Sequence, residues 1–187
     1  MPVGATFAFD PRMTKVSHLI AALLMVPATT AFAADDERGG INLGLDVGPN
    51  FVVDDADNVS DESAGISFAG RLGYRIPVGI LDLTPEAKVG FESPGTPDAF
   101  SLMGGARLAL GTVVTPVVFG HAGGLVGDLE GFVWDAGAGL QLNLDYLSIG
   151  ADVSYNQVVD QVFEVAGTTV NREWQWVRVA GTVAVTF

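Results

Sequence analysis

The chain has 187 residues, a length typical of one domain, and it carries a formal net charge of −13 and no cysteine. Lys and Arg together number only nine, which argues against a nucleic-acid partner, and the absence of cysteine excludes a disulfide framework and a thiolate zinc site. The 24 glycines argue against a helical protein, because glycine inside a helix costs about 1 kcal/mol relative to alanine.

The N-terminal segment has the three parts of a secretory signal peptide. Lys15 supplies a positive charge, residues 19–26 form an apolar run, and the Ala-Phe-Ala sequence ending at Ala33 matches the small-x-small cleavage pattern. The run is shorter than the roughly 20 residues that a membrane-spanning helix needs, although an uncleaved anchor is the alternative. We therefore predict a signal peptide at residues 1–33 and one domain at 34–187, with Met13 as a candidate start of translation.

From Ala34 onward, apolar and polar residues alternate with a period of two, which is the signature of a sheet with two different faces. Residues 115–125 are also extended and β-branched, but both of their faces are apolar, so their face assignment stays open. A transmembrane helix over 108–126 is disfavoured because that stretch contains several glycines and a proline. The clearly alternating segments are 41–53, 66–76, 81–91, 100–110, 134–144, 147–156 and 174–187.

Eight such segments of about 10 to 13 residues match strands that cross a membrane, which need roughly 9–11 residues when tilted. The links between them alternate between short and long, as in outer-membrane barrels with tight periplasmic turns and long extracellular loops. We therefore predict an all-β fold, an eight-stranded antiparallel up-and-down transmembrane β-barrel with both termini in the periplasm. The short links are 77–79, 111–114 and 145–146, and the long links are 54–65, 92–99, 126–133 and 157–173.

The predicted inward face carries five acids and five bases, which could form a neutral salt-bridge network that fills the barrel. These residues are Asp46, Arg71, Arg75, Asp82, Glu86, Lys88, Arg107, Asp135, Asp152 and Arg178. Most of the remaining acids fall in the predicted extracellular loops, namely Asp54, Asp55, Asp57, Asp61, Glu62, Glu92, Asp98, Asp128, Glu130, Asp160 and Glu164. We expect a polar plug inside the barrel and acidic loops outside it.

Together these features make the chain resemble the small outer-membrane β-barrel proteins, the group that contains the OmpA membrane domain and OmpX. The resemblance covers residues 40–187 and includes a last strand that ends Val-Ala-Val-Thr-Phe. In that family a C-terminal Phe, with apolar residues at every second position before it, looks like the signal read by the barrel-assembly machinery. The resemblance implies that role for Phe187, Val185 and Val183.

We expect a structural or surface-interaction protein, monomeric, that contacts outer-membrane lipid and lipopolysaccharide and needs no cofactor and no metal. A narrow channel for small or hydrophobic solutes and a soluble ligand-binding β-barrel are the alternatives. Similar barrels that modify lipid A would require a His near a Ser and a carboxylate. Only one histidine, His121, follows the predicted signal peptide, and no serine lies near it in the sequence, so we predict no catalytic residue and no enzyme.

Overall fold

The computed structural model describes residues 39–53, 64–95, 97–110, 113–165 and 168–187, with the side chains of 160–173 excepted. The predicted signal peptide and the acidic segment 54–63 lie outside these residues, so the predictions on them stay predictions. Eight strands are present: β1 (Gly40–Val52), β2 (Ala64–Val78), β3 (Leu81–Ser93), β4 (Ala99–Leu110), β5 (Val114–Gly127), β6 (Gly131–Leu144), β7 (Leu147–Val165) and β8 (Thr168–Thr186).

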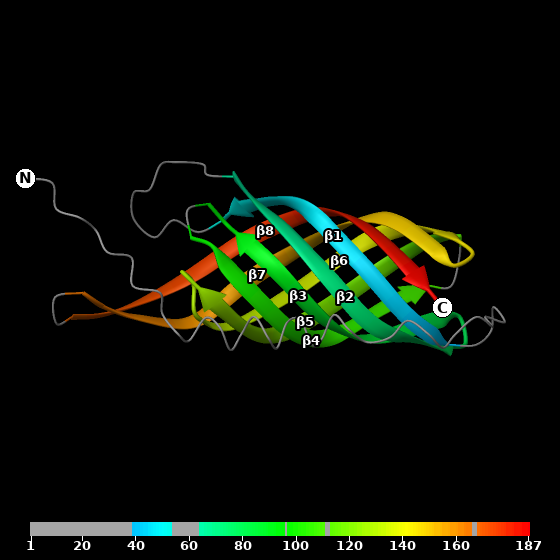
Figure 1. Ribbon diagram of the computed structural model, residues 1–187, viewed down its shortest axis with the longest axis horizontal. Coiled ribbons are helices and arrows are strands. Elements are labelled where there is room, and N and C mark those ends of the chain that lie inside the picture. The colour runs from blue at the N-terminus through cyan, green and yellow to red at the C-terminus, as the bar shows by residue number, and fades with distance from the viewer. Residues whose placement is uncertain (1–38, 54–63, 96, 111–112, 166–167) are drawn as a thin grey trace, which may run out of the picture. The chain divides into compact units, whose positions relative to one another are not determined.

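Each strand pairs antiparallel with the next one, and β8 returns to pair with β1, so the sheet closes into a barrel (Figure 1). Closure is completed by two backbone hydrogen bonds, from Phe187 N to Ile41 O at 2.9 Å and from Ile41 N to Phe187 O at 3.1 Å. The predicted fold class is therefore confirmed. We call the end with the links 79–80, 111–113 and 145–146 the turn end, and the opposite end the loop end.

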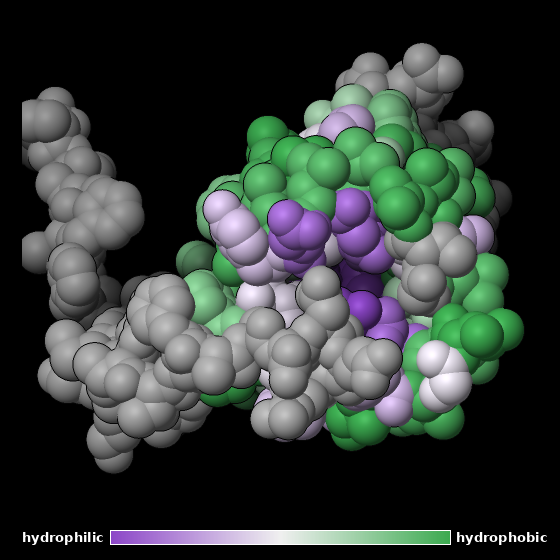
Figure 2. All heavy atoms as spheres, turned by 90° about the vertical axis from the view of Figure 1, so that its right-hand side faces the viewer, coloured by the Kyte–Doolittle hydropathy of each residue, from purple (hydrophilic) through white to green (hydrophobic). Residues whose placement is uncertain are grey.

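The period-two pattern places apolar side chains on the outside and polar side chains on the inside. In β1, Leu43 and Leu45 are exposed on the outer face, whereas Asp46 and Asn50 point inward and are buried. Figure 2 looks into the turn end and shows hydrophilic residues surrounded by a ring of hydrophobic ones. This arrangement is the reverse of a water-soluble barrel, and it suits a barrel whose outer face contacts lipid.

The structure settles the face assignment of the strand whose two faces are both apolar. In β5 the odd-numbered residues point inward, including Val117, Phe119 and His121, while even-numbered residues such as Val118 point outward. The described residues of 108–126 lie in β4, in β5 and in the link between them, so they form no transmembrane helix, as expected. No helix in the described part of the chain is long and apolar enough to span a membrane.

Two of the links predicted to be long are short, because the strands beside them are longer than predicted. Most of segment 157–173 belongs to β7 and β8, which have 19 residues each, so Asp160 and Glu164 lie in a strand and not in a loop. The link between β5 and β6 covers only 128–130, whereas 126–133 was predicted. A register shift between Val158 and Gln161 explains the first error, since it breaks the period-two pattern there.

Candidate functional site in the barrel interior

Arg71 of β2 joins three strands at the centre of the barrel. Its guanidinium donates from Nε to Asp46 Oδ2 at 2.9 Å, from Nη1 to Glu86 Oε2 at 3.1 Å and from Nη2 to Thr182 Oγ1 at 2.7 Å. The alternating strands β1, β3 and β8 turn these three partners toward the same point. Both ion pairs are fully buried, so each charge depends on its partners instead of water.

Glu86 of β3 receives two further contacts, and it is the most connected carboxylate of the described interior. Its Oε1 lies 3.4 Å from Arg107 Nε and 2.9 Å from His121 Nε2. Arg107 also donates from Nη1 to Asp152 Oδ2 at 3.0 Å, and its guanidinium carbon lies 4.6 Å from the centre of the Phe119 ring. Glu86 thus connects residues of β2, β4 and β5.

His121 of β5 lies between two buried carboxylates. Its Nδ1 is 2.6 Å from Asp135 Oδ1, and its Nε2 contacts Glu86 on the opposite side of the ring. An ionised carboxylate only accepts hydrogen bonds, so with both carboxylates ionised both ring nitrogens must donate and the ring carries a positive charge. Asp135 additionally accepts from Lys88 Nζ at 2.6 Å.

All ten inward charges predicted from the sequence point into the barrel, but they form three groups. Seven of them, together with His121, make one connected set that we call the central network: Asp46, Arg71, Glu86, Lys88, Arg107, Asp135 and Asp152. Arg75 and Asp82 form a separate pair at 2.7 Å near the turn end, where Arg75 is partly exposed. Arg178 lies nearer the loop end, with Nη1 3.6 Å from Glu92 Oε1.

The predicted set of interior charges lacks Glu92 and His121. Glu92 was predicted to lie in an extracellular loop, which is wrong, since it is an inward residue of β3 with 2% of its surface exposed. Its even number, shared with Glu86 and Lys88 on the same strand, is the signal that could have placed it. With Glu92 the described interior holds six acids, and with a charged His121 it holds six bases, so its formal charge remains zero.

Uncharged polar residues fill the interior near the turn end. Asn143 Nδ2 donates to Thr115 Oγ1 at 2.7 Å, and Ser148 Oγ donates to Asn143 Oδ1 at 2.8 Å. Asn42 Nδ2 donates to Thr186 Oγ1 at 2.9 Å across the pairing of β1 with β8. Each of these contacts joins two neighbouring strands near the turn end.

In the central network, two buried carboxylate oxygens, Asp46 Oδ1 and Asp152 Oδ1, have no hydrogen-bond partner among the described residues. Near the loop end, more buried polar atoms lack one. They include both amide atoms of Asn50, Glu92 Oε2, Ser101 Oγ, Trp176 Nε1 and Arg178 Nη1. Around them lies a set of buried apolar residues that we call the mouth cluster: Ala99, Met103, Leu125, Leu129, Val133, Val158 and Trp176. Towards the loop end, paired charges therefore give way to unpaired polar atoms mixed with apolar side chains.

Both ring nitrogens of His121 face carboxylates, so the ring presents no free acceptor to the hydroxyl of a serine nucleophile. Within the described residues, no group of three or more His, Cys, Asp or Glu side chains could hold a metal ion.

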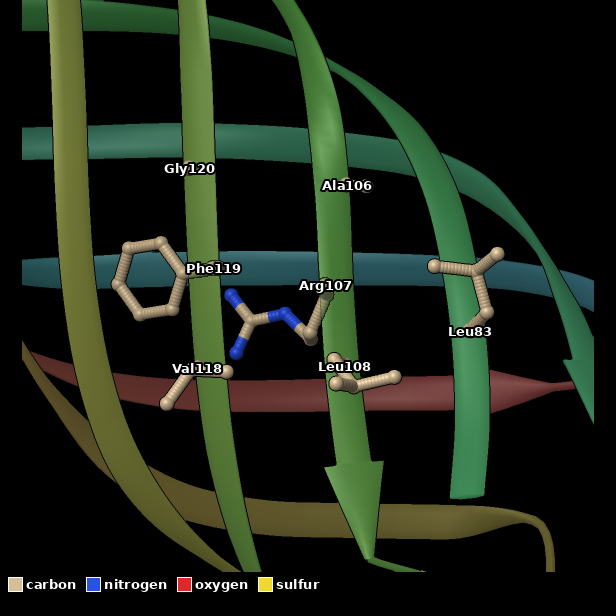
Figure 3. Close-up of a pocket in the computed structure, with 7 residues that line it drawn as sticks. All are labelled: Leu83, Ala106, Arg107, Leu108, Val118, Phe119 and Gly120. Carbon is tan, nitrogen blue, oxygen red and sulfur yellow. The ribbon is translucent and has the colours of Figure 1, made fainter. Parts of the chain in front are cut away.

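A shallow depression of about 240 Å³ lies on the outer wall across β4 and β5 (Figure 3). It forms where Ala106 and Gly120, which are paired in register, leave space beside larger apolar side chains such as Leu108 and Val118. Its one charged lining residue, Arg107, is buried and bound to carboxylates of the central network. The depression is an apolar feature of the lipid-facing wall.

No protein-family model and no curated protein matches this sequence. Among solved structures, Neisserial surface protein A is similar with a TM-score of 0.50 and 14% sequence identity, over 81% of this chain and 100% of that one. Ail, the attachment invasion locus protein of Yersinia pestis, was solved with the heparin analogue sucrose octasulfate and gives a TM-score of 0.43 and 13% identity, over 78% and 99% of the two chains. Ail in a phospholipid nanodisc gives 0.41 and 13%, over 80% and 100%.

The closed ring of eight antiparallel strands, the apolar outer wall and the charged interior define a small transmembrane β-barrel of the outer-membrane type. The likeness to Neisserial surface protein A is a likeness of fold. The chain therefore has the fold of the small eight-stranded outer-membrane barrels, as its sequence predicts.

Proposed function

We propose that this chain is an outer-membrane protein that acts through contacts at the cell surface and does not conduct solutes. The observation that supports this proposal most strongly is the filled interior, in which buried ion pairs cross the barrel from β3 to β6 and from β4 to β7. An eight-stranded barrel is only wide enough for its own side chains. A passing solute would have to separate charges that have no water to replace their partners.

Support for a surface role comes from the end of the barrel formed by β7 and β8. The pairing of β6 with β7 ends at Val159, and the pairing of β1 with β8 ends at Trp176, yet β7 and β8 continue to pair with each other over 161–165 and 168–172 (Figure 1). We call these two segments the surface ribbon. Because about 9–11 residues suffice to cross a membrane, strands of 19 residues extend beyond it.

The orientation and the partners belong to the same proposal. An even number of strands puts both ends of the barrel domain on one side, which we take to be the periplasm, and the predicted signal peptide would direct export there. The barrel-assembly machinery would recognise Val183, Val185 and Phe187 at the end of the sheet. The exposed acids Asp98 and Asp128 at the loop end would contact lipopolysaccharide through divalent cations, with the protein acting as a monomer.

The conductance part is tested with purified protein in planar bilayers. We expect no discrete current steps from the native chain. A Glu86→Ala, Arg107→Ala double variant, which removes two of the large side chains that fill the centre, is the matched control for the sensitivity of the assay and should give steps. Discrete steps from the native chain would overturn the proposal in favour of the narrow channel.

The surface part is tested in cells with the ribbon shortened. Replacing 161–172 by a two-residue turn should leave a barrel that still shows a heat-dependent gel mobility shift, since the barrel pairings of β7 and β8 with their other neighbours lie outside that segment. We expect the shortened variant to lose surface adhesion or envelope integrity to the same extent as a deletion strain. Unchanged adhesion and integrity in both strains would refute a surface role.

A further inference from the structure

The link between β5 and β6 places one apolar side chain inside the barrel. Asp128 and Glu130 are exposed, whereas Leu129 between them has 1% of its surface exposed. A leucine in a surface link is ordinarily exposed in part, since the chain at such a link runs over the surface. The side chain of Leu129 is therefore enclosed by the barrel.

Leu129 belongs to the mouth cluster at the loop end. The other members belong to β4, β5, β6, β7 and β8, so their side chains line more than half of the wall of the barrel interior. Leu129 is the one member that does not belong to a strand. Its side chain fills the space between these strands at the loop end, and we call it the stopper.

Glycines stand at both ends of this link. Gly127 has a φ of 142° and Gly131 a φ of 145°, values that residues other than glycine rarely adopt. A Cβ added at Gly127 would lie 2.6 Å from the carbonyl oxygen of Asp98. The link therefore leaves β5 and enters β6 through two positions with unusual backbone freedom, which is the arrangement of a hinge.

Two hydrogen bonds join Asp128 of the link to the neighbouring loop. The Asp128 amide donates to the Asp98 carbonyl at 2.8 Å, and the Asp98 amide donates to Asp128 Oδ2 at 3.3 Å in an exposed position. Exposed hydrogen bonds exchange readily with water and contribute little net stability. Full burial of a leucine side chain is worth more than such a bond, so Leu129 contributes more to the closed link than these two contacts do.

If the link opened, buried polar atoms beneath Leu129 would gain hydrogen bonds to water. Ser101 Oγ, Glu92 Oε2 and Trp176 Nε1 are buried without hydrogen-bond partners, and each would find one in water. Opening thus exchanges the apolar contacts of Leu129 for the hydration of these atoms. Burial of Leu129 favours the closed link, and hydration of these polar atoms favours the open link.

We propose that residues 127–131 form a hinged lid, with Leu129 as its stopper, that admits water and small solutes to the loop end of the interior as far as Glu92 and Arg178. The central network beneath remains closed when the lid opens. The proposal goes beyond the surface role proposed above and does not depend on it, since a barrel that never conducts can still open this lid.

The test uses the absence of cysteine from the natural sequence. A Ser101→Cys variant puts one thiol on the inner wall beneath the lid, between Ala99 and Met103. Its rate of reaction with a small charged methanethiosulfonate is measured on the folded barrel in liposomes. Glu130→Cys, on the exposed side of the link, reports the reactivity of an open position in every background.

Adding Leu129→Ala to the Ser101→Cys variant should raise the reaction rate of the introduced thiol by about tenfold or more, because the rate follows the population of the open form. Val158→Ala is the control, since Val158 belongs to the same cluster but lies on β7, away from the link and from Ser101. It should change the rate by less than about twofold. Equal rates in the two variants, or no change in either, would contradict the proposal that Leu129 keeps the link closed.

Gly127→Ala provides a second variant that keeps every apolar side chain. It strains the hinge at a φ of 142° and should also raise the rate, while a heat-dependent mobility shift establishes that the barrel is folded. A folded Gly127→Ala protein that reacts at the rate of the parent would refute the hinge.

Discussion

The centre and the loop end of the barrel interior are built from the same strands, yet they stabilise buried polar groups in different ways. In the centre, ion pairs with nitrogen–oxygen distances of 2.6–3.4 Å connect each charged side chain to at least one opposite charge. Near the loop end the described ion pair is longer, 3.6 Å between Glu92 and Arg178, and Asn50 has no hydrogen-bond partner at either amide atom.

The period-two alternation decides whether a side chain points inward, but it does not decide whether an inward polar side chain finds a hydrogen-bond or ion-pair partner. The central residues depend on partners from several strands, so each of them is sensitive to the loss of any other. Several polar groups near the loop end lack a hydrogen-bond partner, so truncating them removes no hydrogen bond. Variants of the same residue type, one with partners and one without, measure this difference directly.

The largest difference is expected between two buried glutamates of β3. Glu86→Gln leaves Arg71, Arg107 and His121 with a weaker partner and should lower the free energy of unfolding by about 3–5 kcal/mol. Glu92→Gln removes a buried charge whose described ion pair, with Arg178, is 3.6 Å long, and should change the free energy of unfolding by less than about 1 kcal/mol. Denaturant unfolding in lipid vesicles, followed by tryptophan fluorescence, measures both. Equal losses would show that the two regions do not differ.

A smaller difference is expected between two buried asparagines. Asn156 donates to Ser154 O, Ser154 Oγ and Trp176 O, so Asn156→Leu should cost about 1–3 kcal/mol. Asn50 lies beside the Glu92 carboxylate without a hydrogen bond of standard geometry, so Asn50→Leu should lie within about 1 kcal/mol of the parent. The same unfolding assay applies, and a cost for Asn50→Leu as large as that for Asn156→Leu would mean that Asn50 is hydrogen-bonded in the membrane.

The smallest difference is expected between two buried serines. Ser67 Oγ donates to Gly48 O at 3.3 Å, whereas Ser101 Oγ has no partner. Ser67→Ala should cost about 0.5–1.5 kcal/mol, and Ser101→Ala should be nearly neutral. Because each step is small, the temperature at which the fast-migrating folded band disappears is compared over several repeats. A larger loss for Ser101→Ala than for Ser67→Ala would mean that Ser101 is hydrogen-bonded in the membrane.

Much of the fold could be predicted from the sequence because a barrel in lipid has outward apolar and inward polar residues at alternate positions of each strand. Leu43 and Leu45 must face lipid while Asp46 beside them faces inward, and a few residues of this pattern fix the orientation of a whole strand. The pattern fails where its physical cause is missing. In β5, Val117 and Leu125 point inward although they are apolar, and Leu125 packs in the mouth cluster, so the two faces look alike.

The rest could not be predicted because it depends on other strands. The register shift after Val158 is a backbone irregularity that hides the strand beyond it. The partnership of His121 with Glu86 and Asp135 joins residues of β3, β5 and β6, which no spacing within one strand reveals. Glu92 is the exception, since its position in the alternation was readable and its acidic character suggested a loop instead.

The contact between β1 and β8 bears on how the barrel assembles. The other strand pairs form between neighbours in sequence, whereas the Asn42–Thr186 hydrogen bond joins residues 144 positions apart. Closing so long a loop is the slow, entropically costly step of folding. Until this seam forms, β1 and β8 each expose a row of unpaired backbone groups, which hydrocarbon does not tolerate. Hydrocarbon therefore favours closing the seam as the strands enter the bilayer.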